Sequence, residues 1–196
     1  AFAKDNADIS AVNQLFNGLV QMDSLMNVVP AIANSWQISE NAKVYTFELR
    51  SDVYFHTHEL FGTEQTRTVT AHDFVFSFDR LIDPKLASPG GWVLQNVESY
   101  KALSEQRFQI TLKSPFPAFL GLLTMKYCSV VPKEIIAHYG ADFRSNPIGT
   151  GPYKFKRWES AQYVQLERNE DYYFSIPKIK NIIMKIIPDS NTALLA

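Results

Sequence analysis

The chain has 196 residues, of which 46% are hydrophobic, and it carries 19 basic and 20 acidic side chains. This length and apolar content predict a packed core in one large domain or two small ones, and they exclude a disordered chain. The formal net charge of −1 leaves no basic excess to neutralise phosphates, so we expect no nucleic-acid partner. No run of the sequence approaches the ~18 apolar residues of a membrane span.

The single cysteine and the two ends of the sequence carry further information. Cys128 has no partner for an internal disulfide, and its apolar surroundings favour a small buried core residue over a reactive thiol. Residues 1–4 lack the features of a signal peptide, and residues 191–196 form a helix-like pattern without a stop signal. We therefore expect a piece of a longer protein.

The first quarter of the chain changes from a helical to an alternating pattern. Apolar residues three to four positions apart predict a helix over residues 7–20. Residues 29–36 are predicted to be a connector. The strict alternation in residues 43–50 predicts a half-buried antiparallel strand, and residues 53–56 predict a second, short strand.

A second helix is marked by its N-terminal signal. Residues 58–67 are polar and predict a loop. Thr70 and Asp73 then have the spacing of a capping box, with Asp in place of the usual Glu, and an apolar helical face continues to Ile82. Residues 88–92, Ser-Pro-Gly-Gly-Trp, predict a flexible turn that bears a large aromatic side chain.

The second half of the chain mixes strand and helix signals. Alternation predicts a strand over residues 107–113, and Ser114 followed by Pro115 predicts the start of a helix. A further helix is expected over residues 133–139, with Gly140 closing it. Three more strands are predicted over residues 153–158, 163–168 and 182–187. This order favours an α+β fold with a mixed sheet over a doubly wound one.

Residues 145–153, Ser-Asn-Pro-Ile-Gly-Thr-Gly-Pro-Tyr, are expected to form a sharply bent, ordered turn. Gly149 and Gly151 permit positive φ angles, while Pro147 and Pro152 fix φ and remove hydrogen-bond donors. By itself this pattern indicates a turn and no chemistry.

Few residues suggest a reactive or metal-binding centre. His56 and His58 could clasp a metal ion, but no third ligand is evident nearby, and two polar residues at a strand end are favoured. We find no nucleophile elbow and no Walker-type lysine loop, so an enzyme has little support. Trp92 stands in a glycine-rich turn, where ligand contact and packing back onto the core are equally compatible alternatives.

Several fragments, taken in order, resemble one protein family. They are Gln14–Val20 with Asp23, Pro30-Ala-Ile-Ala-Asn-Ser-Trp36, Tyr45-Thr-Phe-Glu-Leu-Arg50, Val53-Tyr-Phe-His56, Thr70–Phe78, Pro147–Tyr153 and Glu167–Tyr173. Each fragment is weak alone, but their order and spacing extend over nearly the whole chain. The sequence is similar to the extracellular solute-binding proteins of family 5, which serve peptide and nickel ABC transporters.

The resemblance implies a type II periplasmic-binding-protein fold, of which this chain would be the N-terminal lobe. Residues 1–30 and 146–196 would form a discontinuous main-lobe segment, and residues 31–145 an inserted α+β subdomain. A second lobe would follow Ala196 and close over the ligand. The acidic residue that holds a peptide's amino terminus belongs to that second lobe in peptide-binding members.

The resemblance also implies which parts of this lobe approach the ligand. They are the loop before the first helix and the turn of the inserted subdomain, so the expected ligand-binding residues are Lys4, Asp5, Asn6, Ala7, Gly90, Gly91 and Trp92. No catalytic residue, metal ligand or cofactor is expected.

The implied function is the capture of oligo- or dipeptides and their delivery to the permease subunits of an ABC transporter. The implied location is the periplasm or the extracellular face of the cytoplasmic membrane, with association through the transporter or a lipid anchor, and a monomer is expected. A nickel chelate, haem or an oligosaccharide remains an alternative cargo. A periplasmic hydrolase or structural module on the same scaffold is the less favoured alternative from another class.

Overall fold

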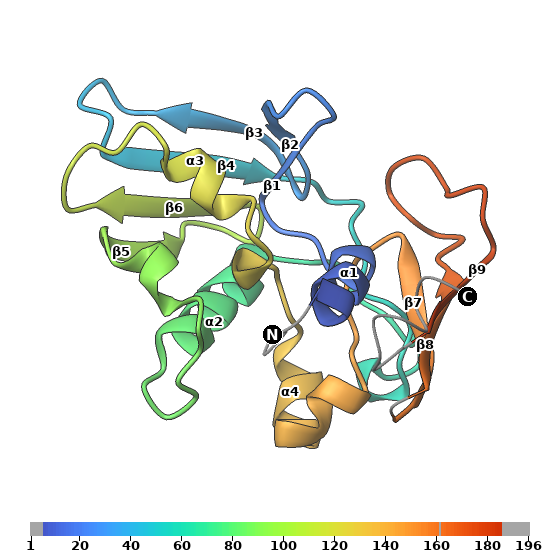
Figure 1. Cartoon of the computed structure of the whole chain (residues 1–196). Coiled ribbons are helices and arrows are strands. Elements are labelled where there is room, and N and C mark those ends of the chain that lie inside the picture. The colour runs from blue at the N-terminus through green and yellow to red at the C-terminus, as the bar shows by residue number, and fades with distance from the viewer. Residues whose placement is uncertain (1–5, 161, 186–196) are drawn as a thin grey trace, which may run out of the picture.

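The protein combines three antiparallel sheets, of two, four and three strands, with short helices (Figure 1) in a computed structural model that describes residues 6–160 and 162–185. In chain order the elements are α1 (Asn6–Leu15), β1 (Val20–Met22), β2 (Val28–Pro30), β3 (Ala33–Ile38), β4 (Val44–Leu49), η1 (Glu59–Phe61), α2 (Ala71–Ile82), η2 (Gly91–Leu94), β5 (Val97–Ala102), β6 (Arg107–Leu112), α3 (Phe119–Leu123), η3 (Lys126–Cys128), α4 (Lys133–Tyr139), η4 (Gly140–Ser145), β7 (Tyr153–Glu159), β8 (Tyr163–Arg168) and β9 (Asn181–Lys185), where η marks a 3-10 helix. This mixture confirms the α+β expectation. Within the described ranges, none of the helices is both long and apolar enough to span a bilayer.

The four-stranded sheet has the strand order β3-β4-β6-β5, with every neighbouring pair antiparallel. As the alternation predicted, β4 buries every second residue, and its Phe47 lies opposite Phe108 of β6. Helices α2 and α3 cover this apolar face, α2 through Phe74 and Phe78 and α3 through Phe119. The opposite face carries polar side chains, so the main core lies between the sheet and its two helices.

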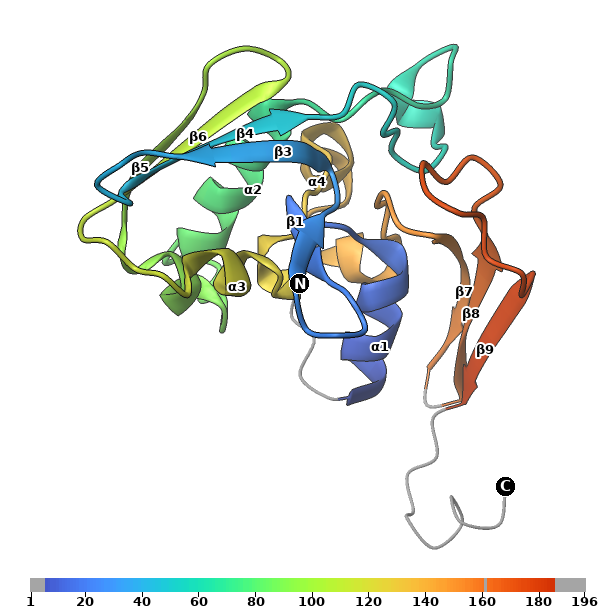
Figure 2. The same cartoon turned by 90° about the horizontal axis from the view of Figure 1, so that it is seen from above.

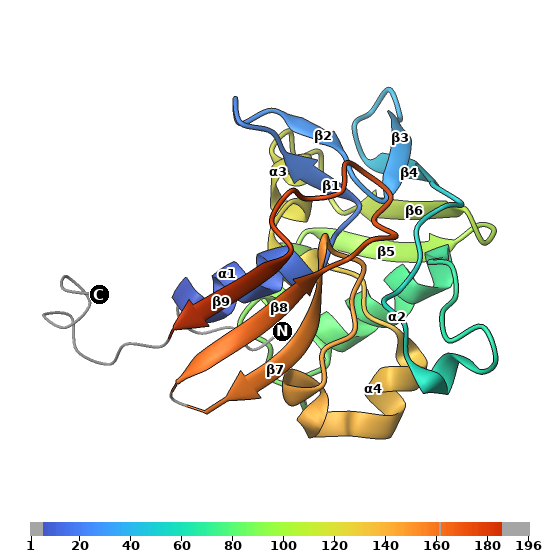
Figure 3. The ribbon, with the colours of Figure 1, turned by 90° about the vertical axis from the view of Figure 1, so that its right-hand side faces the viewer.

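The three-stranded sheet is a meander of β7, β8 and β9 that lies against α1 (Figures 2 and 3). A second, smaller core fills this contact. It contains Leu15 and Phe16 at the C-terminal end of α1 and Tyr153 and Leu166 from the sheet. These four side chains are each at most 5% exposed, so burial of their apolar surface holds α1 on the strands.

Several boundaries differ from the sequence-based expectation. The first helix ends at Leu15 and not at residue 20, and a hairpin of β1 and β2 follows. The expected connector over residues 29–36 contains the end of β2 and most of β3. The expectation of a helix starting at Ser114 is wrong, because α3 begins at Phe119; Pro117 disfavours helical geometry at the residue before it.

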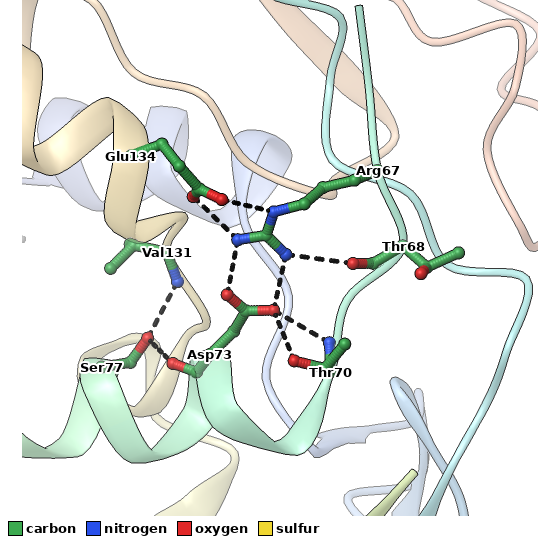
Figure 4. A network of polar contacts seen from close by, with 7 residues as sticks. All are labelled: Arg67, Thr68, Thr70, Asp73, Ser77, Val131 and Glu134. Carbon is green, nitrogen blue, oxygen red and sulfur yellow. Dashed lines mark hydrogen bonds and ion pairs between the residues drawn. The ribbon is translucent and has the colours of Figure 1, made fainter. Parts of the chain in front are cut away.

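The predicted capping box at the start of α2 is present and belongs to a larger polar cluster (Figure 4). The Thr70 amide donates to the Asp73 carboxylate at 2.9 Å. Arg67 forms two hydrogen bonds of 2.7 and 2.8 Å with the buried Asp73 and two of 2.8 Å with Glu134. Its guanidinium also lies over the Phe55 ring, 4.9 Å from the centroid. Arg67 therefore ties the N-terminal turn of α2 to α4.

Replacing Arg67 by Met should lower the free energy of unfolding by about 2–3 kcal/mol, because the buried Asp73 carboxylate loses its charge partner. The matched control is Arg107→Met, which breaks the exposed Arg107–Glu48 pair and should cost at most about 1 kcal/mol. Urea denaturation of both variants measures the difference. Equal effects would show that the Arg67 cluster contributes no more than a surface ion pair.

Candidate functional site

The segment Gly149–Gly151 is pressed against the C-terminal end of α1. The Gly151 amide donates to the Leu15 carbonyl at 2.9 Å. A Cβ on Gly149 would lie 2.0 Å from that same carbonyl oxygen, and a Cβ on Gly151 would lie 2.2 Å from the Gln14 oxygen. Neither glycine uses the positive φ angles that it permits. Glycine is required here because two backbones approach closely.

The buried His56 side chain forms hydrogen bonds with both ends of this glycine segment. Its Nδ1 accepts from the Gly149 amide at 3.3 Å, and its Nε2 lies 3.0 Å from the Gly151 carbonyl. An amide can only donate and a carbonyl can only accept, so the proton of the neutral ring is on Nε2. Burial lowers the pKa of His56 from 6.5 to about 4. The imidazole is therefore neutral at physiological pH.

Two buried asparagines complete the polar contacts of the segment. The backbone N–H of Asn17 donates to the Thr150 hydroxyl at 3.3 Å. That hydroxyl in turn donates to the side-chain Oδ1 of Asn17, also at 3.3 Å. The Asn169 side chain donates to the Gly151 carbonyl at 3.2 Å. We call Gly149–Gly151 with Asn17, His56 and Asn169 the glycine junction. It joins α1, the segment after β4 and both ends of the β7–β8 hairpin.

The possible metal clasp at His56 and His58 is not supported by the structure. Both ring nitrogens of His56 are used within the glycine junction. The His58 Nδ1 accepts from the Leu60 amide at 3.2 Å, and its Nε2 lies 3.1 Å from the Tyr139 hydroxyl. No cluster of three or more potential ligands of the His, Cys, Asp or Glu type exists among the described residues.

The expected ligand-binding residues fall into two places. Lys4 and Asp5 lie outside the described residues, while Asn6 and Ala7 are the first two residues of α1. Gly90, Gly91 and Trp92 form the entry to η2, with Gly90 as its N-cap. Trp92 is 51% exposed, so it does not pack back onto the core. The next two residues of η2, Val93 and Leu94, are buried and hold the turn that presents it.

The short helix η3 contacts the Trp92 turn and the C-terminal end of α1, which the sequence did not reveal. A Cβ on Gly90 would lie 2.1 Å from Cγ of Tyr127, so only glycine allows this ring to sit against the turn. The neighbouring Lys126 donates from its ammonium to the Phe16 carbonyl, just after α1, at 3.3 Å. Element η3 therefore lies between α1 and the Trp92 turn, and Lys126 and Tyr127 join the candidate site. The only sequence signal was a lysine in an otherwise apolar stretch.

Two hollows on the described surface lie away from these residues. One, of about 310 Å³, lies beside the Arg67 cluster, and its lining includes Thr68, His72 and Lys133. Another, of about 400 Å³, lies on the outer side of the three-stranded sheet. The candidate site is thus an open edge of this lobe, formed by α1, η3 and the Trp92 turn.

Comparison with known proteins gives this fold a family. The model of the bacterial extracellular solute-binding proteins, family 5 (middle), matches residues 27–196. The chain belongs to this family. It is 32% identical over 199 residues to di/tripeptide-binding protein 2 of Pseudomonas aeruginosa, and the match covers 93% of this chain and 37% of that protein.

Solved structures of similar proteins contain the same fold. The periplasmic binding protein DppA of Helicobacter pylori, in complex with the peptide STSA, matches with a TM-score of 0.88 and 29% identity over 100% of this chain and 41% of that one. NikZ of Campylobacter jejuni, in complex with Ni(L-His), matches with a TM-score of 0.85 and 32% identity over 100% and 38%. The chain thus spans about two fifths of its relatives, and its fold is that of type II periplasmic binding proteins.

Adding one methyl group at the glycine junction should be severely destabilising. Gly151→Ala is expected to lower the free energy of unfolding by about 3 kcal/mol or more, because its Cβ would meet the backbone of α1. Gly121→Ala is the matched control, since a Cβ there meets nothing within 4 Å and the residue lies in a helix. The control should be about 0.5–1 kcal/mol more stable than the wild type. Urea denaturation tests both, and a harmless Gly151→Ala would contradict the close approach.

The neutral state of His56 should make stability depend on pH between about 4 and 6.5. The unfolded chain takes up a proton near pH 6.5, but the folded chain does so only near pH 4. The free energy of unfolding should therefore fall by about 3 kcal/mol as the pH drops through this window, and His56 adds nothing further below it.

The matched comparison for this pH dependence uses two variants. His56→Gln removes the titrating group, so its stability should change less between pH 6.5 and 4 than that of the wild type. His72→Gln replaces an exposed histidine and should keep the wild-type slope. Denaturation curves across the window measure all three slopes; identical slopes would show that His56 does not hold its neutral form.

Proposed function

We propose that this chain is the N-terminal lobe of the substrate-binding component of an ABC transporter. The component binds oligo- or dipeptides in a cleft between two lobes and delivers them to the permease subunits. The observation that supports this most is the match of the whole chain to a peptide-bound family member at a TM-score of 0.88. The relative from Pseudomonas aeruginosa is likewise named for di- and tripeptides. Catalysis is not part of this function.

The arrangement of the two larger sheets supports the proposed domain division. The four-stranded sheet lies within residues 31–145, the inserted subdomain, and the three-stranded sheet within residues 146–196. With residues 1–30, the latter segment forms the main-lobe part of the chain, because α1 packs on β7 and β8. The second lobe closes over the open edge at α1, η3 and the Trp92 turn. Closure is selected by ligand that contacts both lobes.

The proposed setting follows from the family. The protein works in the periplasm or on the extracellular face of the cytoplasmic membrane, as a monomer that associates with the membrane through the transporter or a lipid anchor. The ligand-facing residues of this lobe are Lys4–Ala7 and Gly90–Trp92. Peptide main chain is bound by strand-like hydrogen bonds, which tolerate many side chains.

The direct test is to identify what the intact protein carries. Native mass spectrometry and metal analysis of the protein, purified without denaturation, should find short peptides in the cleft. A nickel–histidine complex, haem or a sugar as the bound species would instead favour one of the other cargoes. Turnover of peptidase or esterase substrates by the purified protein would contradict a pure binding function.

Trp92→Ala should weaken peptide binding about tenfold or more, because a half-exposed aromatic on an anchored turn loses its contact with the ligand. Tyr54→Ala is the matched control: Tyr54 is 47% exposed and lies outside the proposed edge, so affinity should stay within about twofold. Isothermal titration calorimetry on the intact protein measures both. Unchanged affinity of the Trp92 variant would remove this turn from the ligand site.

A further inference from the structure

Lys126 holds a positive charge at a partly buried place where the described chain supplies little to balance it. Its ammonium has three donors, and one hydrogen bond is formed, the 3.3 Å contact with the Phe16 carbonyl. Within residues 10–160 and 162–185, no carboxylate lies within ion-pair distance of Lys126. The protein groups of this range therefore engage one of its three donors.

The surroundings make this charge costly in the absence of a partner. Desolvation lowers the pKa of Lys126, which means that the site disfavours the charged form. The C-terminal end of α1 offers a partial negative charge, but through the single Phe16 carbonyl. By contrast, Lys156 is half-exposed and lies 3.0 Å from Glu167. Lys126 is more buried than Lys156 and has no such partner among residues 10–160 and 162–185.

The position of Lys126 relates this charge to the open edge of the lobe. Residue 126 begins η3, which lies between α1 and α2 in Figure 1. The next residue, Tyr127, packs against Gly90 in the turn that carries Trp92. The ammonium thus lies at the C-terminal end of α1, one residue from the tyrosine that packs against the Gly90–Trp92 turn. An anion at this edge would meet a donor that is already positioned.

We propose that Lys126 binds a carboxylate of the ligand, an inference that rests on the proposed peptide-binding function. The carboxylate accepts hydrogen bonds from the two unused donors and replaces the water that burial removes. Charge-assisted hydrogen bonds of this kind are strongest where solvent is excluded, as happens when a second lobe closes. The carboxylate is either the C-terminus of a peptide or an acidic side chain.

The test compares ligands that differ in one negative charge. Calorimetry on the intact, full-length protein would use trialanine against its C-terminal amide, and Ala-Asp-Ala amide against Ala-Asn-Ala amide. The variants are Lys126→Met, which keeps the length of the stem, and Lys101→Met, a control that removes an exposed lysine from β5. Melting temperatures verify that each variant is folded.

The wild type should bind the charged member of at least one pair about tenfold more tightly than the neutral member. Lys126→Met should abolish this preference, and Lys101→Met should keep it. The pair that shows the preference identifies which carboxylate is bound.

Two other results would overturn the inference in distinguishable ways. If charged and neutral peptides bind the wild type equally, or Lys126→Met weakens both equally, Lys126 is not a carboxylate site while peptide binding stands. If no peptide binds the wild type, the proposed function itself fails and the inference fails with it.

Discussion

The close approach of Gly149–Gly151 to the end of α1 is the constraint on which the rest of this lobe depends. Only residues without a Cβ allow the two backbones to come so near, and the Gly151–Leu15 hydrogen bond then fixes their register. Because α1 ends there, the chain leaves the helix at Phe16 and turns into the β1–β2 hairpin. The same contact sets β7, and with it the three-stranded sheet, against α1.

Buried polar groups make this contact specific, whereas apolar packing alone would tolerate sliding. His56, Asn17 and Asn169 each offer donors and acceptors that match one arrangement of the glycine segment. A shifted register would leave these groups buried without partners, at a cost of about 1–3 kcal/mol each. The neutral imidazole belongs to this arrangement, since a protonated Nδ1 would face the Gly149 amide. The glycine junction therefore fixes how α1, the segment after β4 and the β7–β8 hairpin are joined.

The same packing places the candidate ligand edge. Phe16, immediately after α1, receives the Lys126 ammonium, and Tyr127 of the same short helix lies against Gly90. The rigid core behind η2, formed by Val93 and Leu94, leaves Trp92 half-exposed at that edge. A binding protein benefits from such an arrangement, because pre-positioned donors and aromatic rings cost little entropy when the ligand arrives.

Structural features that depend on residues close together in the chain were predicted correctly from the sequence. The alternation in β4, the capping box at Thr70 and Asp73 and the closure of α4 by Gly140 all depend on residues a few positions apart. The ordered fragments also indicated the family and the α+β class. By contrast, the length of the first helix was overestimated, and the close approach of Gly149 and Gly151 to α1 was not predicted, because it joins residues more than a hundred positions apart.

The sequence by itself determined the class of fold, the main core strands and the protein family, because the hydrophobic period and the order of the motifs are visible in the sequence. Only the tertiary structure decided that His56 is a buried neutral partner of a glycine segment and that Lys126 is a half-buried cation beside Trp92's turn. Burial, and therefore protonation and pairing, depends on which distant residues come together, and a one-dimensional pattern does not record that.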